Sequence, residues 1–293
     1  MEKIGIIGLG NMGMGIAKNL IKGGYATMGY DLRKECLEEL VSHGGEAAES
    51  VSQIGKLCDV VFVMVMNGNQ VKEVVTQLSP GLNGRGTIII TATITPEEVR
   101  GAYNIAKKSN IRMVDSPVSG GLDGAHEGTL TLMTSADDKT FSDCHDILDA
   151  ISKDIFHVGK NIGDGQTVKA SLQSFIGSTF AAIFESLVLG SKAGIDGKTL
   201  YDVFSSSGVS SPLFKNCAKL IMDRKFENTG SHISTMYKDL GITMDMAKKN
   251  GVPMFTTGAA FELFQAGISM YPEGDNWSIV KVLEKMADTK VEW

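Results

Sequence analysis

Few cysteines are present, and none is placed for a disulfide framework or a metal site. The four cysteines are scattered and form no CxxC pair: Cys36, Cys58, Cys144 and Cys217. Such spacing argues against disulfides and fits a reduced, cytoplasmic setting. The five histidines also stand apart, without the spacing of metal ligands. We therefore expect a cytoplasmic protein that binds no metal.

An excess of positive charge is also lacking. The sequence has 28 Lys and Arg against 34 Asp and Glu, a net charge of -6, which argues against nucleic acid or an anionic membrane as partner. Apolar runs such as Val60 to Met66 are too short to span a bilayer. The N-terminus, MEKIGIIGLG, enters a strand at once and has no cleavable signal. We expect neither a nucleic-acid partner nor a membrane.

The sequence does contain enough apolar residues for two domains. It is 293 residues long and 43% hydrophobic, so it can bury a large core. Short apolar strands alternate with helices up to about residue 163, with strands expected at 3–7, 26–30, 59–65, 86–91, 111–115, 129–135 and 154–158. Only helices follow the long helix described below, at 198–206, 212–223, 233–250, 256–266 and 277–287. The pattern predicts an α/β domain over 1–163 and a helical domain over 164–293.

A glycine-rich loop follows the first strand. Gly8, Gly10 and Gly13 form GxGxxG between a strand and an amphipathic helix, which is the context that dinucleotide binding requires. The first glycine permits the tight turn, the second lets a pyrophosphate approach the backbone, and the third lets helix and strand pack closely. The helix N-terminus then offers N–H groups to phosphate. We predict a Rossmann domain with cofactor contacts from Gly8, Leu9, Gly10, Asn11, Met12 and Gly13.

The end of the second strand indicates which dinucleotide is bound. Asp31 follows this strand, and a carboxylate here can accept hydrogen bonds from the adenosine ribose and repel a 2'-phosphate. Arg33 favours NADP instead, because an arginine at this place can bind the 2'-phosphate. We predict NAD over NADP, with Asp31, Leu32 and Arg33 beside the adenosine.

A long apolar helix connects the two predicted domains, at about 165–193. Alanine, leucine, phenylalanine and isoleucine recur around most of its circumference, which suits a helix buried on nearly every side. Lys169 and Gln173, four residues apart, share one face of its first turns. On spacing alone, Lys169 could equally mark the solvated end of the helix.

The loop after the strand at 111–115 has the sequence SPVSGG. It lies at a strand's carboxyl end, where ligands of open α/β sheets bind. Ser119 supplies a hydroxyl, and Gly120 and Gly121 can expose backbone N–H groups beside it, a plausible cradle for a carboxylate. Taken by itself, the segment could also be only a turn.

Five motifs in order, GLGNMG, DSPVSGG, EGTLTLM, GxGxxxK and YKDLG, resemble those of the β-hydroxyacid dehydrogenase family. The resemblance covers essentially the whole chain. It implies a Rossmann domain, a long interdomain helix, a helical second domain and a small hydroxy acid as substrate. By this resemblance Lys169 matches the catalytic lysine. It also implies substrate contacts from Ser119, Gly120, Gly121, Gln173 and Asp239, and cofactor contacts from Val65, Met66, Thr93 and Lys238.

Three positions depart from the usual family pattern. Most members have asparagine where Gln173 stands, and proline where Gly15 and Met66 stand. Together with VMNGNQV, these departures resemble the L-threonate dehydrogenase branch and favour a sugar acid as substrate. The 3-hydroxyisobutyrate dehydrogenases and tartronate semialdehyde reductases of the same family remain alternatives.

Functions outside this family are less consistent with the sequence. A non-catalytic NAD-binding protein would not need Lys169 or the SGG loop. The imine reductases share the architecture but lack this lysine. A decarboxylating 6-phosphogluconate dehydrogenase would need a larger helical domain than 293 residues allow.

Hydride transfer from an alcohol also requires a group that takes the hydroxyl proton. Lys169 is the candidate, and a lysine serves as a base at neutral pH only where burial disfavours its charged form. We also expect a homodimer or homotetramer, because the long helix is apolar on more faces than two domains easily cover. Gly177, Ala181 and Ala182 would allow another helix to approach closely.

Overall fold

The computed structural model describes residues 3–82, 84 and 86–293. The chain forms two compact units, Met1–Lys169 (unit 1) and Ala170–Trp293 (unit 2). The division falls inside one helix, whereas the sequence placed a domain boundary between residues 163 and 164. Each unit has its own hydrophobic core.

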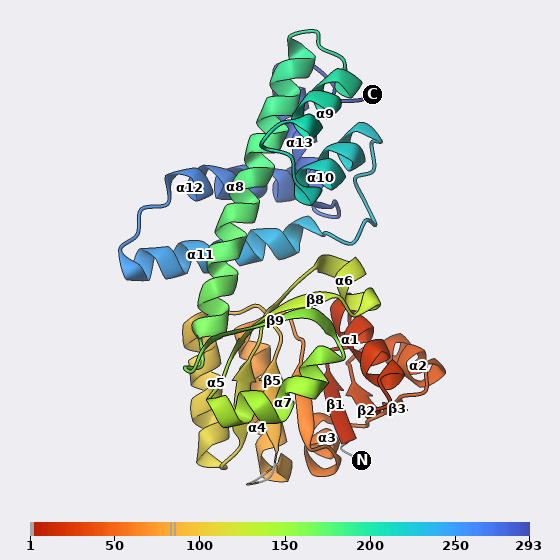
Figure 1. Cartoon of the computed structure of the whole chain (residues 1–293), viewed down its shortest axis with the longest axis vertical. Coiled ribbons are helices and arrows are strands. Elements are labelled where there is room, and N and C mark those ends of the chain that lie inside the picture. Colours follow the sequence, from red (N-terminus) through yellow and green to blue (C-terminus); the bar gives the residue numbers. More distant parts are fainter. Residues whose placement is uncertain (1–2, 83, 85) are drawn as a thin grey trace. The chain divides into compact units, whose positions relative to one another are not determined.

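Unit 1 is built on one sheet with helices on both faces (Figure 1). Over the described residues its strands are Lys3–Ile7 (β1), Ala26–Tyr30 (β2), Glu46–Ala47 (β3), Val60–Val63 (β4), Thr87–Ile90 (β5), Arg112–Asp115 (β6), Val118–Ser119 (β7), Leu130–Ser135 (β8) and Ser152–Gly159 (β9). The order is β3-β2-β1-β4-β5-β6-β8-β7, with β9 beside β8. The strands from β3 to β6 are parallel, and β8 is antiparallel to β6 and β7. The predicted α/β class is confirmed.

The central strands are apolar because helices cover both their faces. All four residues of β4, and all four of β5, are buried. One core cluster lies on each face of the sheet, which is why these strands read as continuous apolar runs rather than alternating ones. The strands expected at 59–65 and 86–91 are shorter in the structure, because their flanking residues turn into loops.

Seven helices of unit 1 lie within the described residues: Asn11–Lys22 (α1), Lys34–Ser42 (α2), Val51–Leu57 (α3), Gly68–Leu82 (α4), Pro96–Lys108 (α5), Gly121–Glu127 (α6) and Asp138–Asp149 (α7). The sequence analysis did not anticipate α2, α3, α6 and α7. Local signals exist for two of them, since Ser50 caps α3 and Asp137 caps α7 through side-chain hydrogen bonds. A capping box of Thr95 and Glu98 begins α5, and Pro96 lies in its first turn.

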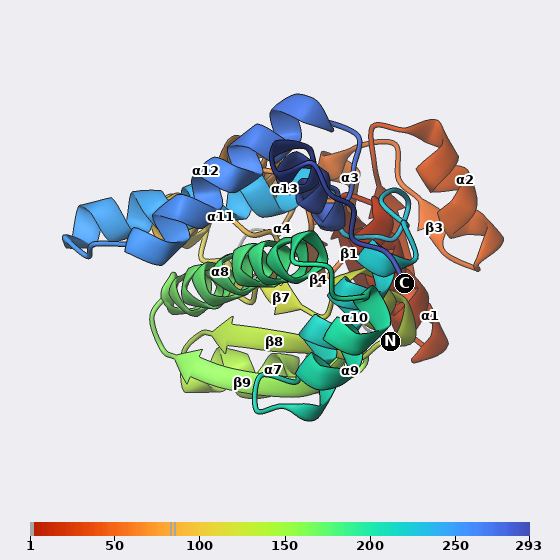
Figure 2. The same cartoon turned by 90° about the horizontal axis from the view of Figure 1, so that it is seen from above.

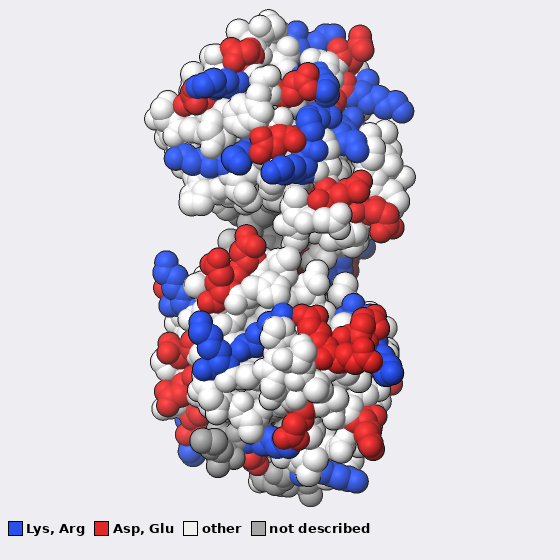
Figure 3. Space-filling view, turned by 90° about the vertical axis from the view of Figure 1, so that its right-hand side faces the viewer, with Lys and Arg blue, Asp and Glu red and all other residues white. Residues whose placement is uncertain are grey.

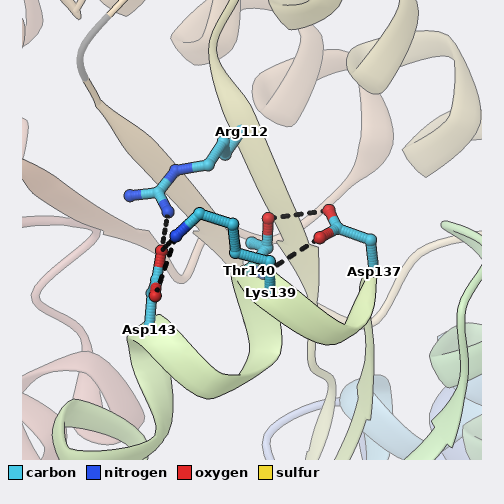
Figure 4. Close-up of polar contacts among 5 residues, drawn as sticks. All are labelled: Arg112, Asp137, Lys139, Thr140 and Asp143. Atoms are coloured by element: carbon cyan, nitrogen blue, oxygen red, sulfur yellow. Dashed lines mark hydrogen bonds and ion pairs between the residues drawn. The ribbon is translucent and has the colours of Figure 1, made fainter.

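An exposed ionic cluster joins the start of β6 to α7 (Figure 4). Asp143 on α7 accepts hydrogen bonds from Arg112, the first residue of β6, and from Lys139, 2.9 Å away on its own helix. Asp137 accepts from both the backbone N–H and the hydroxyl of Thr140. The cluster lies at the amino end of β6.

Unit 2 is helical throughout. Its elements are the continuation of Asp164–Lys192 (α8), then Gly197–Ser206 (α9), Pro212–Met222 (α10), Ile233–Asn250 (α11), Phe255–Met270 (α12), the 3-10 turn Asn276–Ile279 (η1) and Val280–Ala287 (α13). The helices α11 and α12 run side by side, as Figure 1 and Figure 2 show. Acidic and basic side chains are interspersed on the face drawn in Figure 3. The expected helix at 233–250 is confirmed residue for residue, and the expected helix at 277–287 begins with η1.

The long helix α8 is not buried on nearly every side, contrary to the expectation. Phe184 and Leu187 are fully buried in the core of unit 2. Phe175 is 71% and Leu189 72% exposed, so one stripe faces outward. By length and composition alone α8 could cross a membrane. Its apolar residues instead supply much of the core of unit 2.

The last residues of the chain pack into unit 2. Arg224 forms a salt bridge with the buried Glu284 and also donates to the carbonyl of Val291. The N–H of Val291 donates to Glu284 at 2.7 Å. A Cβ added to Gly197, at the start of α9, would lie 2.1 Å from the carbonyl oxygen of Glu292, so only glycine lets this segment approach. Residues 291–293 therefore complete the packing of α9, α10 and α13.

Candidate active site

The glycine loop after β1 has the geometry of a phosphate cradle. Gly8 has φ +90°, and a Cβ on it would lie 2.2 Å from the carbonyl oxygen of Met64. A Cβ on Gly13 would lie 1.9 Å from the carbonyl oxygen of Gly8, so α1 packs directly on the turn. At Gly10 the nearest atom to such a Cβ is an Arg33 nitrogen at 3.5 Å. Protein atoms occupy the space where a side chain at Gly8 or Gly13 would lie, whereas the space beside Gly10 is open to a ligand.

The N-terminus of α1 has donors available for a phosphate. Gly10 is the N-cap residue, and it provides no side-chain hydrogen bond to the first turn. The first N–H groups of a helix otherwise need a partner, which an anion supplies well. Leu9 lies in the loop between β1 and α1, and Asn11 and Met12 are the first two residues of α1. The cradle fits the pyrophosphate of a dinucleotide.

Asp31 lies beside this loop, at the carboxyl end of β2. Its carboxylate accepts a hydrogen bond of 2.7 Å from the N–H of Leu9 and one of 3.1 Å from Nε of Arg33. Burial alone would raise the pKa of Asp31, but hydrogen bonds from Arg33 and Leu9 outweigh it and lower the pKa. The carboxylate is thus ionised at neutral pH, and Arg33, whose guanidinium is near Gly10, balances part of its charge.

Apolar side chains flank the two sides of this nucleotide site. Leu32, next to Asp31, is 88% exposed, and Met66, after β4, is 58% exposed. Val65 packs against the core beneath the sheet's carboxyl edge. Exposed apolar side chains at such an edge suit the flat face of an adenine or nicotinamide ring.

The SPVSGG segment combines a short strand with a helix start. Ser119 ends β7, Gly120 has φ +129° and Gly121 has φ +64°, and α6 begins at Gly121. Both glycines adopt backbone conformations that side chains disfavour. The backbone at these two positions requires glycine. The binding of a carboxylate by this segment is a proposal.

The GxGxxxK motif docks the start of α8 onto the sheet. Gly163 has φ +103°. A Cβ on Gly165 would lie 2.4 Å from the carbonyl oxygen of Met133 and 2.9 Å from that of Asp115. These two glycines let the first turn of α8 lie directly against the ends of β6 and β8. Lys169 follows one turn later and is only 6% exposed.

A buried carboxylate receives this first turn. Asp115, the last residue of β6, is fully buried and accepts hydrogen bonds from the N–H groups of Gly163 (2.9 Å) and Gln166 (3.3 Å) and from the hydroxyl of Ser135 (3.2 Å). Burial raises the pKa of Asp115 to about 6, against the opposing effect of these hydrogen bonds. The carboxylate is therefore ionised at neutral pH and is stabilised by neutral donors rather than by a cation.

Gln166 extends the same network to the loop after β5. Its side chain donates to Oδ1 of Asp115 (2.8 Å) and to the carbonyl of Ala92 (3.0 Å), and accepts from the N–H of Ile94 (3.1 Å). The residue between the last two is Thr93. Neither Asp115 nor Gln166 was among the predicted site residues. The available signal was a polar residue three positions before Lys169, on the same face of a helix that docks on buried strands.

In unit 2, the predicted substrate residues Gln173 and Asp239 contact each other. Nε2 of Gln173 donates to Oδ2 of Asp239 at 2.6 Å and also contacts the sulfur of Met236 at 3.6 Å. The other carboxylate oxygen of Asp239 forms an ion pair with Nζ of Lys238 at 2.8 Å. Gln173 and Asp239 are 6% and 4% exposed. Both hydrogens of the Gln173 amide therefore already have partners within unit 2.

One of the departures from the family pattern has a structural reason. Gly15 lies in α1 against α6, and a Cβ there would lie 2.7 Å from the backbone of Ala125. No larger residue fits unless α6 moves. In this chain, Gly15 therefore sets how closely α1 and α6 pack.

Comparisons with known proteins cover both units. Residues 3–159 match the profile of the NAD binding domain of 6-phosphogluconate dehydrogenase, and residues 163–283 match that of the NAD-binding domain of NADP-dependent 3-hydroxyisobutyrate dehydrogenase. The chain is 33% identical to 2-(hydroxymethyl)glutarate dehydrogenase of Eubacterium barkeri, over 99% of this chain and 97% of that protein. It is 32% identical to L-threonate dehydrogenase of Cupriavidus necator, over 96% of each.

The chain belongs to the β-hydroxyacid dehydrogenase family. A solved structure of a 3-hydroxyisobutyrate dehydrogenase from Salmonella typhimurium agrees, with a TM-score of 0.88 at 28% identity over 96% of this chain and 100% of that one. The protein is an oxidoreductase that acts on hydroxyl groups, and its cofactor is NAD. The resemblance inferred from the five motifs is confirmed.

Proposed function

We propose that this β-hydroxyacid dehydrogenase oxidises a polyhydroxylated acid of about four carbons, with L-threonate as the first candidate. Tartronate semialdehyde and glycerate come next, and 3-hydroxyisobutyrate is the alternative. The observation that carries the proposal is the hydrogen bond from Gln173 to Asp239, which leaves the Gln173 carbonyl oxygen as the group for a ligand. A hydroxyl can donate to that oxygen, and a methyl group or a carboxylate cannot.

Proton transfer is assigned to Lys169. When bound, NAD accepts the hydrogen and the two electrons that leave the alcohol carbon. The amine of Lys169 takes the hydroxyl proton as the carbon–oxygen double bond forms, and the ammonium returns it in the reverse direction. The near-complete burial of Lys169 supports this role, because a buried amine is shielded from proton exchange with bulk water. The loop of Ser119, Gly120 and Gly121 is assigned to the substrate carboxylate, and Thr93 and Lys238 to the nicotinamide end.

The orientation of Gln173 gives the substrate preference. An amide NH₂ has two hydrogens, and in Gln173 these face the Asp239 carboxylate and the Met236 sulfur. If the amide were turned around, its carbonyl oxygen would face the Asp239 carboxylate, and neither group has a hydrogen to donate. The hydrogen bond between Gln173 and Asp239 would then be lost. We therefore assign Asp239 to orienting Gln173. A substrate without a hydroxyl at this point would leave a polar oxygen without a partner, at a cost of about 1–3 kcal/mol.

The same orientation opposes a second carboxylate in the substrate. A dicarboxylic acid such as 2-(hydroxymethyl)glutarate would bring an anion toward the Gln173 carbonyl and toward the carboxylate of Asp239, which is paired with Lys238. Like charges that are brought together in a buried site disfavour binding. Although a relative with that name is 33% identical, we expect this protein to prefer the monocarboxylic sugar acid.

A substrate panel tests the proposal. We would measure kcat/KM by NADH absorbance for L-threonate, D-glycerate, 3-hydroxyisobutyrate and 2-(hydroxymethyl)glutarate, on the wild type and on Gln173→Asn. The wild type should prefer L-threonate by at least about tenfold, and Gln173→Asn should reduce that preference. The same change at an exposed position, Gln77→Asn, is the control and should leave the ranking unchanged. A wild-type preference for 3-hydroxyisobutyrate or for the dicarboxylate contradicts the proposal.

We further propose that the protein is a cytoplasmic homodimer or homotetramer. Of the three small residues on α8, Gly177 and Ala181 are buried within unit 2, where Gly177 packs against Leu240, and Ala182 is exposed. The support now comes from Leu189 on α8 and Met286 on α13, which are 72% and 79% exposed beside the same apolar hollow. Light scattering at micromolar concentration should give a multiple of 31.3 kDa, and a monomer would contradict this.

A further inference from the structure

We propose that Asp115 and Gln166 are positioning residues that hold the loop after β5, the end of β6 and the first turn of α8 in one fixed arrangement. The proposal rests on the function assigned above to Thr93, Ser119 and Lys169, which those three segments carry. We call the two side chains, with their shared hydrogen bonds, the clamp. Neither side chain has a part in proton transfer, although both are buried.

The amide of Gln166 holds the backbone on both sides of Thr93. Its oxygen accepts from the N–H of Ile94, and its nitrogen donates to the carbonyl of Ala92. Because a backbone N–H can only donate and a carbonyl can only accept, the orientation of the amide is determined. The second hydrogen of the nitrogen is donated to Asp115. The amide of Gln166 thus forms three hydrogen bonds. The residue is 1% exposed.

Asp115 fixes the other two segments. One carboxylate oxygen accepts from the backbone N–H groups of Gly163 and Gln166, which fixes the first turn of α8 in place. Lys169 lies three residues after Gln166, nearly one turn further along the same helix. The residue after Asp115 begins the segment that leads to Ser119. The clamp therefore connects all three segments through buried hydrogen bonds of 2.8 to 3.3 Å.

Positions held in this way matter because hydride and proton must leave the same alcohol group. A misplacement of about 1 Å can reduce the rate about a hundredfold without any change in the reacting groups. The adenosine half of the dinucleotide depends on other elements, namely Gly8–Gly13 and Asp31 at the ends of β1 and β2. Loss of the clamp should therefore lower kcat and leave cofactor affinity nearly unchanged.

Two variants separate positioning from stability. Gln166→Met keeps the length of the side chain and removes all three of its hydrogen bonds. Ser135→Ala is the matched control, because it removes bonds to Asp115 and to the N–H of Gly165 but leaves the contacts of Gln166 with the loop after β5. Both changes remove buried hydrogen bonds from the same network. Only the first removes the hydrogen bonds to the backbone on both sides of Thr93.

Amide hydrogen exchange tests the clamp without any substrate. In Gln166→Met, the N–H of Ile94 loses its acceptor and should exchange at least about tenfold faster than in the wild type. The N–H groups of the Gly8–Gly13 loop should be unchanged. In Ser135→Ala, exchange at Ile94 should stay within about threefold of the wild type. If Ile94 exchanges at the wild-type rate in Gln166→Met, the clamp does not exist.

Kinetics test its role in catalysis. We expect Gln166→Met to lower kcat by at least about tenfold and to raise the primary deuterium isotope effect on kcat, while the Kd for NADH changes less than about threefold. A merely structural loss would reduce the fraction of folded enzyme and leave the isotope effect unchanged. Wild-type kcat in Gln166→Met would overturn the positioning role. Absence of turnover in the wild type with every hydroxy acid would instead contradict the proposed function, and the exchange result would still decide on the clamp.

Discussion

The two ends of β6 carry opposite kinds of polar network. At its amino end, Arg112 and Lys139 surround the exposed Asp143 with formal opposite charge. At its carboxyl end, Asp115 is buried, and neutral N–H and O–H groups surround it. The ion pairs have more charge but are screened by water, so they contribute little to stability. The buried carboxylate depends on each of its donors, and its neighbours include the residues assigned to catalysis.

Loss of Lys169 should have the largest effect at the carboxyl end. Lys169→Ala removes the group that exchanges the substrate proton, and should lower kcat by at least about a hundredfold. NADH affinity, measured by fluorescence titration, should be nearly unchanged. Activity within a few-fold of the wild type would place the proton relay elsewhere.

Asp115 should make the free energy of unfolding depend on pH. Burial raises the pKa of Asp115 from 3.8 to about 6, so between these values the folded protein holds a proton that the unfolded chain has lost. The stability contributed by this group is therefore full below pH 3.8 and is lost as the pH rises through 6, by about 3 kcal/mol in total. Asp115→Asn cannot titrate and should lack this component.

The measurement for Asp115 is hydrogen exchange in β6 from pH 4 to 8, which reports opening of unit 1. As the pH rises from 4 to about 6, the opening free energy of the wild type should fall relative to that of Asp115→Asn. If the two proteins show parallel curves, Asp115 titrates in the folded state as it does in the unfolded chain.

Cofactor choice gives a smaller effect at the carboxyl end of β2. Asp31→Ser removes the charge that opposes a 2'-phosphate, so the ratio of kcat/KM for NAD to that for NADP should fall by about tenfold. Arg33→Ala should shift the ratio in the other direction. A wild type that uses both cofactors equally, or prefers NADP, would defeat the assignment of Asp31.

The smallest effect is expected at the amino end of β6. Hydrogen bonds from Lys139 and Arg112 lower the pKa of Asp143, but the group is exposed to water. Asp143→Ala should change Tm by no more than about 2 °C and leave kcat unchanged. Salt at 1 M should reduce even this difference. A larger change in Tm would mean that the Arg112–Lys139–Asp143 cluster contributes as much to stability as the buried hydrogen bonds of Asp115.

The sequence could predict features that have a local cause, and it could not predict contacts between residues far apart in the chain. The glycines at 8, 10 and 13 and the apolar strands revealed the nucleotide-binding half, because each has one dominant local cause, a turn or a buried run. The helices α2, α3, α6 and α7 were missed. The amphipathic patterns of α3 and α6 are brief, since each helix has only seven residues, whereas α7 is as long as α1. The bond between Gln173 and Asp239 joins residues 66 positions apart, and the clamp joins residues up to 74 apart. No periodicity in the sequence records such contacts.

The segment 291–293 has a consequence for how the protein is made. Its contacts with Arg224, Glu284 and Gly197 belong to the core of unit 2, so that unit cannot finish folding until residue 293 has left the ribosome. Unit 1 has its own core and all its strands by residue 159, and domains generally fold as units during synthesis, the N-terminal one first. During synthesis the nascent chain would therefore carry a completed nucleotide-binding half ahead of a helical half that still exposes apolar surface.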